Sequence, residues 1–65
     1  MDRYSYHEAL DRVFIQASQL EAALGEHPVI HHHPEAKALY EQASDKLGAL
    51  YQLLGELSFQ QDQKN

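Results

Sequence analysis

The sequence contains no cysteine and no tryptophan among its 65 residues. Without thiols the chain can form neither a disulfide framework nor a zinc site built on thiolates. No apolar run approaches the ~20 residues that span a membrane, and no basic-then-apolar signal segment follows Met1. We therefore expect a cytoplasmic protein without a membrane association.

Basic residues are also scarce. Five lysines and arginines stand against ten acidic residues, which gives a formal net charge of −5. Nucleic-acid phosphates are bound through clustered lysine and arginine, whereas the five here are scattered along the chain. We expect no direct nucleic-acid binding. The acidity fits a basic protein partner, although solubility alone is the simpler interpretation.

Signatures of catalysis and of cofactor binding are missing from the sequence. There is no glycine-rich phosphate loop, and no serine stands in a recognisable arrangement with a base and an orienting group. Ser5 is better explained as a helix cap. We therefore expect a protein that is not an enzyme and that holds no cofactor.

The first positive signal is a heptad pattern. Ser5-Tyr6-His7-Glu8 matches a capping box, in which the serine and the glutamate satisfy amides at a helix start. Gly25 can take the left-handed conformation that ends a helix. The pattern predicts a first helix over about residues 6–24. Its apolar positions recur at steps of four and three: Tyr6, Leu10, Val13, Ala17, Leu20 and Leu24.

The same rhythm returns after Pro34, a residue suited to a first helical position. It predicts a second helix over about residues 34–58, a histidine- and proline-rich turn over 25–33 and a frayed polar tail over 60–65. The repeating apolar positions are Ala36, Tyr40, Ala43, Leu47, Leu50, Leu54 and Leu57.

The predicted fold is all-α, an antiparallel two-helix hairpin that forms one domain over residues 1–65. Facing residues should have numbers that add up to about 60, which pairs Ala17 with Ala43. The apolar stripes occupy three positions per heptad, which is wider than one neighbouring helix can cover. We therefore expect the hairpin to form a homodimer, a four-helix bundle. Its predicted dimer core consists of Leu10, Val13, Ala17, Leu20, Tyr40, Ala43, Leu47, Leu50, Leu54 and Leu57.

Some apolar residues lie outside this core, and Gly48 and Gly55 share one face of the second helix. The glycines indicate either close approach of another backbone or tolerated surface positions. The residues predicted to bind a partner are Phe14, Ile15, Tyr51, Leu53 and Phe59, although the dimer can use the same residues.

The expected function is that of a small, acidic, non-catalytic protein–protein interaction module. It would be a homodimeric regulator or inhibitor that binds a protein target. Analogy at the level of class, with the anti-activators that mobile elements encode, favours a bacterial regulatory or nucleic-acid-binding protein as that target.

Two alternatives stay open. The turn carries four histidines, and imidazole is a common metal ligand, so the chain can be a metal- or pH-responsive bundle. Consecutive residues point in different directions, which limits the candidate metal ligands to two, His31 and His33. The hairpin build also resembles the small plasmid copy-number regulators. That resemblance implies an RNA-binding four-helix bundle, which the acidity disfavours.

Overall fold

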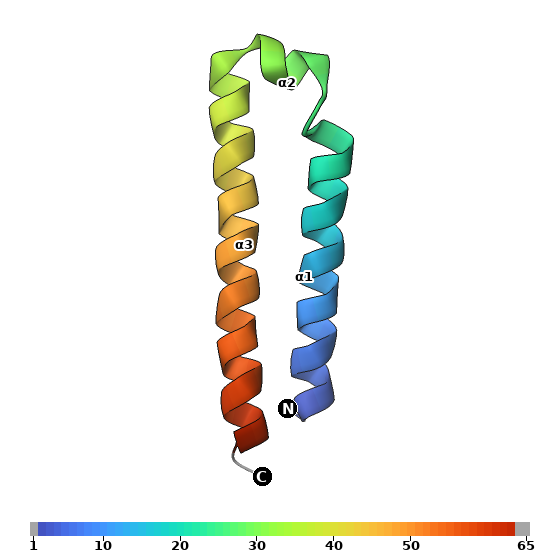
Figure 1. The fold of residues 1–65 in the computed structure, drawn as a ribbon, viewed down its shortest axis with the longest axis vertical. Helices are drawn as coiled ribbons and strands as arrows, with labels where there is room; N and C mark the ends of the chain where they lie inside the picture. Colours follow the sequence, from blue (N-terminus) through green and yellow to red (C-terminus); the bar gives the residue numbers. More distant parts are fainter. Residues whose placement is uncertain (1, 64–65) are drawn as a thin grey trace.

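The protein is an all-helical hairpin. A computed structural model describes residues 2–63, which form α1 (Arg3–Leu24), α2 (Pro28–His32) and α3 (Pro34–Gln63). The long helices α1 and α3 run side by side in opposite directions, and the short α2 crosses between them at the closed end (Figure 1). The predicted all-α hairpin is confirmed over these residues, which contain no strand. The predicted turn over 25–33 was wrong in part, because Pro28 at a first helical position and the His27 cap start the short helix α2 there.

The molecule is long and thin. Its extents are 50 × 15 × 13 Å and its radius of gyration is 14.9 Å. A compact domain of this length would have a radius of gyration of about 11 Å. The hairpin is therefore one layer of helices with no second layer to cover it.

The start of α1 differs from the capping-box prediction. The helix begins at Arg3, and Asp2 is its N-cap in an extended conformation. The backbone amide of Ser5 donates to Asp2 Oδ1 at 3.0 Å, and the Ser5 hydroxyl lies 3.2 Å from the same atom. Aspartate caps a helix as well as serine does, so the earlier residue adds almost a full turn. These hydrogen bonds, the amide first, hold the pKa of Asp2 below its ordinary value.

The end of α1 also differs. Gly25 has right-handed dihedrals (φ −57°, ψ −38°), not the expected left-handed ones, and its amide donates to the Glu21 carbonyl at 2.8 Å. The glycine therefore continues the helical hydrogen bonding. The chain reverses further on, where the His27 amide donates to the Leu24 carbonyl at 3.2 Å and Pro28 opens α2.

The second long helix continues past its predicted end. The expected tail over 60–65 was wrong over residues 60–63, because α3 runs to Gln63; Lys64 and Asn65 lie outside the described residues. Near this end Gln61 is half-buried, and Asp62 Oδ2 lies 3.7 Å from His7 Nε2 of α1. Glutamine also favours helix over coil.

The face of α1 that meets α3 is the predicted one. Every apolar position of its heptad pattern is half-buried, while most residues between them are exposed. Those positions are Tyr6, Leu10, Val13, Ala17, Leu20 and Leu24.

The face of α3 is rotated relative to the prediction. Tyr40, Leu47 and Leu54 are half-buried as expected, but Ala43, Leu50 and Leu57 are exposed. The residues that follow Leu50 and Leu57 take their place in the contact with α1: Tyr51 packs against Phe14, and Ser58 is buried. Small serines and an aromatic pair let α3 lie against α1 on this side.

The register is shifted as well. The contact of Phe14 with Tyr51, and the approach of Gly25 to the Tyr40 hydroxyl, both join residues whose numbers add up to about 65, not 60. Figure 1 shows the reason: α2 lies across the closed end, and α1 stops below the first turns of α3. The first turns of α3 therefore contact α2 instead of α1.

Candidate interaction surfaces

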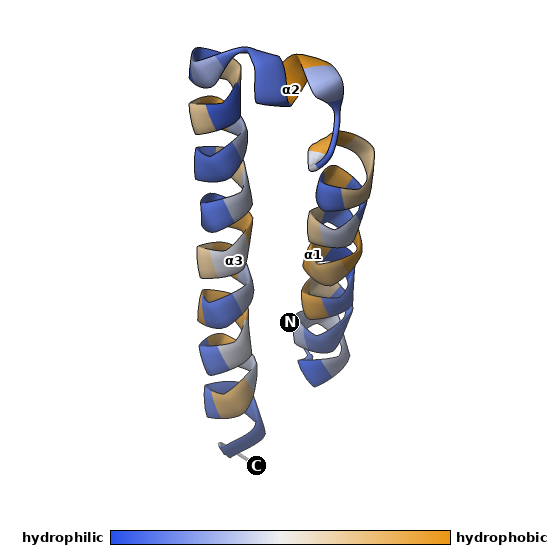
Figure 2. Cartoon of the chain, turned by 45° about the horizontal axis from the view of Figure 1, so that its top comes forward, coloured by the Kyte–Doolittle hydropathy of each residue, from blue (hydrophilic) through white to orange (hydrophobic). Residues whose placement is uncertain are grey.

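The hairpin buries its own apolar residues only in part. Among residues 2–63 no apolar side chain is fully buried, and Ser58, at 4% exposed, is the single buried residue. Hydrophobic segments recur from turn to turn along α1 and α3 (Figure 2). No helix of the described chain combines the length and the apolar character that a membrane crossing requires.

One exposed apolar surface is a side of α3, which we call the leucine strip. Its residues are spaced by four, seven, three and four positions, so they share one side of the helix. Leu39 is 59% exposed and Leu53 is 51% exposed. The leucine strip consists of Leu39, Ala43, Leu50, Leu53 and Leu57, with Lys46 in the one heptad position that lacks an apolar residue.

A second apolar surface lies on the opposite side of the hairpin. The rings of Phe14 and Tyr51 have centroids 6.4 Å apart at an interplanar angle of 51°, and both side chains are exposed. Around α3 the leucines stand roughly 100–160° away from Tyr51, at about 100° per residue. The aromatic pair and the leucine strip therefore mark two different faces.

The five predicted partner-binding residues do not form one surface. The structure joins Phe14 with Tyr51, and it places Leu53 in the leucine strip. Ile15, 50% exposed, follows Phe14 by one residue and so points away from it, and Phe59, 62% exposed, lies two turns beyond Tyr51.

The predicted dimer core likewise divides into two groups. Seven of its ten residues are half-buried between α1 and α3 of the same chain: Leu10, Val13, Ala17, Leu20, Tyr40, Leu47 and Leu54. The remaining three, Ala43, Leu50 and Leu57, are exposed members of the leucine strip. Their role in a dimer stays a prediction.

Sequence reasoning missed the second heptad line of α3, Ser44, Tyr51 and Ser58. These residues are seven apart: Tyr51 pairs with Phe14 of α1, Ser58 is buried, and Ser44 is exposed at the hollow near the closed end. The signal was available, because seven-residue spacing puts them on one side of the helix. It was hidden by the stronger leucine pattern one residue earlier.

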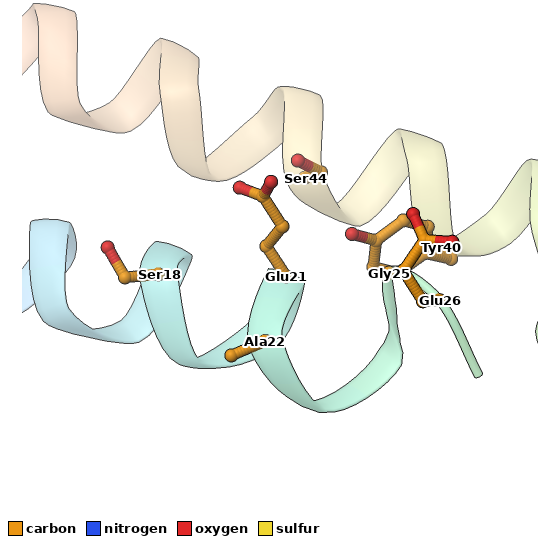
Figure 3. Close-up of a pocket in the computed structure, with 7 residues that line it drawn as sticks. All are labelled: Ser18, Glu21, Ala22, Gly25, Glu26, Tyr40 and Ser44. Atoms are coloured by element: carbon orange, nitrogen blue, oxygen red, sulfur yellow. The ribbon is translucent and has the colours of Figure 1, made fainter.

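A hollow of about 650 Å³ lies near the closed end, between the end of α1 and the start of α3. Figure 3 shows the side chain of Glu21 reaching from α1 toward α3 near Ser44, with Tyr40 beside Gly25. Two carboxylates and three hydroxyls in such a hollow can accept hydrogen bonds from a cationic group. Its lining residues are Ser18, Glu21, Ala22, Gly25, Glu26, Tyr40 and Ser44.

The histidines of the turn make structural contacts. His27 caps α2, because its Nδ1 accepts from the Val29 amide at 3.1 Å. His31 Nε2 lies 2.7 Å from the Gly25 carbonyl, to which it donates, and 3.7 Å from Glu26 Oε2. The turn is thus held by two imidazoles, His27 as an acceptor and His31 as a donor.

Among the described residues, His31 and His33, the predicted metal ligands, do not belong to a cluster of metal-binding side chains. Within residues 2–63 no group of three or more histidine, cysteine, aspartate or glutamate side chains lies close enough to hold a metal ion. His31 Nε2 already meets a carbonyl, and the ring of His33 lies edge-on to that of His32, with centroids 5.1 Å apart. Metal binding by this pair stays a prediction.

Between Asp2 and Gln63 the charged contacts are few and lie at the surface. The Arg12 guanidinium is 3.6 Å from the Glu8 carboxylate one turn away, and both side chains are largely exposed. Such a pair contributes at most a few tenths of a kcal/mol.

In comparisons with known proteins, no family model, no curated protein and no solved structure matches the chain.

Proposed function

We propose that the chain is a non-catalytic protein–protein interaction module that acts as a homodimer of hairpins, a four-helix bundle, and regulates or inhibits a protein target. One observation carries the dimer: no apolar side chain among residues 2–63 is fully buried. A chain of this size needs stabilisation from a disulfide, a metal or a second subunit. The sequence has no cysteine, so without a metal the second subunit is the remaining source.

The exposed area supports this proposal. The chain exposes 5268 Å². A folded monomer of 7.5 kDa is expected to expose about 4,250 Å², so the hairpin has an excess of about 1,000 Å². A standard protein interface buries about 800 Å² from each partner. Association with one second hairpin would remove most of the excess.

The target-binding part of the proposal rests on the aromatic side of the hairpin and on charge. Phe14 is 61% exposed beside Tyr51, and aromatic residues are enriched where interfaces gain most of their energy. The net charge of −5 would steer a basic protein toward the chain. A bacterial regulatory or nucleic-acid-binding protein has that chemistry.

Thermal unfolding at several protein concentrations tests the dimer. Because dissociation accompanies unfolding, a tenfold rise in concentration should raise the Tm by about 5 °C. A Tm that does not change between micromolar and hundred-micromolar protein would contradict the proposed dimer.

A quantitative affinity experiment from host extract tests the target. The immobilised chain is compared with a Phe14→Ala/Phe59→Ala variant, with the helicity of both checked by circular dichroism. We expect at least one protein to be retained by the unmodified chain alone and to bind again when purified. If every retained protein is also held equally by the variant, the aromatic surface does not bind a target.

A further inference from the structure

We infer that the occupant of the leucine strip is the leucine strip of a second copy of this chain, packed antiparallel, with α3 against α3 over residues 39–57. This inference rests on the proposed dimer and specifies its face, direction and register. The other exposed apolar surface, around Phe14 and Tyr51, is left outside the dimer.

The strip is complementary to itself in one register. When two copies of α3 run antiparallel so that facing residue numbers add up to 96, Leu39 meets Leu57 of the partner. Ala43 then meets Leu53 of the partner, a small residue opposite a large one, as interdigitated layers require. Every apolar residue of the strip meets an apolar side chain or the stem of Lys46.

Lys46 decides between the two possible directions. In a parallel pair related by a twofold axis, each strip residue would face its own copy, and two ammonium groups would meet inside an apolar seam. In the antiparallel register Lys46 faces Leu50 of the partner. Its methylene stem can then lie along the leucine while the charge stays in water.

The neighbouring side of α1 leaves room for a second hairpin. Ala9, Gln16 and Ala23 are seven apart and stand roughly 140–180° around α1 from Phe14, on the same side of the hairpin as the leucine strip. Two of these three residues are alanines, over which helices can approach closely. Arg12 stands on the same side, and its exposed guanidinium, 3.6 Å from the Glu8 carboxylate, would lie at the border of the interface.

The exposed area of the chain agrees with a single interface per hairpin. The exposed excess of about 1,000 Å² per chain is close to what a single standard interface buries per partner. A second interface of similar size on the aromatic side is therefore not required for a folded dimer. The leucine strip, which carries four leucines, is the more apolar of the two sides.

Engineered disulfides test the face, since the chain has no cysteine of its own. The single variants Ala43→Cys and Leu53→Cys test the direction: neither should form a covalent dimer, because only a parallel pair would bring either thiol against its own copy. In the Ala43→Cys/Leu53→Cys variant, each new thiol should face the other new thiol of the partner. Ten residues of helix separate the two within one chain, about 15 Å, so they cannot pair with each other. After mild air oxidation we expect more than four fifths of the chain to migrate as a covalent dimer.

The matched control is Ser44→Cys/Gln52→Cys. It has the same number sum and lies at the same height along α3, but on the side away from the strip. We expect it to stay mostly monomeric in size on a non-reducing gel. If the control forms the covalent dimer as readily as Ala43→Cys/Leu53→Cys, the proposed face is wrong.

Light scattering of the reduced variants separates the inference from the proposed function. If the reduced Ala43→Cys/Leu53→Cys variant is a dimer but oxidation does not cross-link it, the proposed face or register is wrong. The proposed dimer itself would not be contradicted by that result. If the unmodified chain is itself monomeric, the proposed dimer fails together with the inference.

A second pair of variants avoids any loss of leucine. Lys46→Leu completes the apolar strip and should lower the Kd of the dimer about tenfold. Lys37→Leu makes the same change outside the strip and should leave the Kd within about twofold. Equal effects of the two substitutions, measured by sedimentation, would overturn the inference.

Discussion

At the residue scale, the three glycines have different surroundings. A Cβ atom added at Gly25 would lie 2.6 Å from the Glu21 carbonyl oxygen and 3.2 Å from the Tyr40 hydroxyl. At Gly48 and Gly55 it would meet nothing within 4 Å. Gly25 is therefore required by close approach within the chain, while the other two lie on the side of α3 away from the leucine strip.

Alanine substitutions should separate the glycines. Gly48→Ala and Gly55→Ala should each raise the free energy of unfolding by about 1 kcal/mol, because alanine favours helix and meets no clash. Gly25→Ala should lower it by about 1–3 kcal/mol through overpacking. Urea unfolding at one fixed protein concentration measures all three. A loss of stability on Gly48→Ala would show that another backbone approaches that position.

The cap of α1 should respond to pH. Because the folded pKa of Asp2 lies below its ordinary value of 3.8, its contribution to stability is complete above that value. It is lost as the pH falls through the lowered pKa. Hydrogen exchange of the Ser5 amide should therefore show less protection in acid. Asp2→Asn, which still caps a helix but does not titrate, should keep its protection over the same range.

At the element scale, the short α2 depends on its first residue. His27 accepts from the Val29 amide through Nδ1, as asparagine can through its side-chain oxygen. We expect His27→Asn to keep α2 and His27→Ala to fray it, with amide exchange faster at Val29 by about fivefold or more. Nuclear magnetic resonance exchange rates measure the difference. Equal protection in both variants would mean that the imidazole does not hold the turn.

The elements that the sequence predicts well are those with long periodic patterns. The heptad of α1 identified its inward face, and Pro34 identified the start of α3. The predicted ends of α1 were wrong because neighbouring residues can serve equally well as caps or helix ends. Asp2 and Ser5 are equally good caps, and Gly25 can continue a helix as readily as end it when a later proline makes the reversal.

Rotation and register of α3 could not be read from periodicity alone. A helix with apolar residues at three heptad positions has two possible inward faces, one through Leu50 and one through Tyr51. The aromatic contact with Phe14 and the crossing of α2 decide between them. Because the rotation of α3 was unknown, the sequence predicted exposed apolar residues as the interaction residues but could not divide them between two surfaces.

At the scale of the whole molecule, the hairpin is too thin to enclose a core. A layer 13 Å deep is about as thick as a single helix, so a side chain is covered from one direction only. Leaving a leucine or phenylalanine in water forfeits ~1.5–3 kcal/mol relative to full burial. The proposed second hairpin on the leucine strip would supply the missing layer and would leave the aromatic side for another protein.

Sedimentation equilibrium of the unmodified chain tests most directly whether this layer exists in solution. Over tens to hundreds of micromolar we predict a single species of twice the chain mass of 7.5 kDa. A species of 7.5 kDa that is fully helical by circular dichroism at the same concentrations would contradict the dimer.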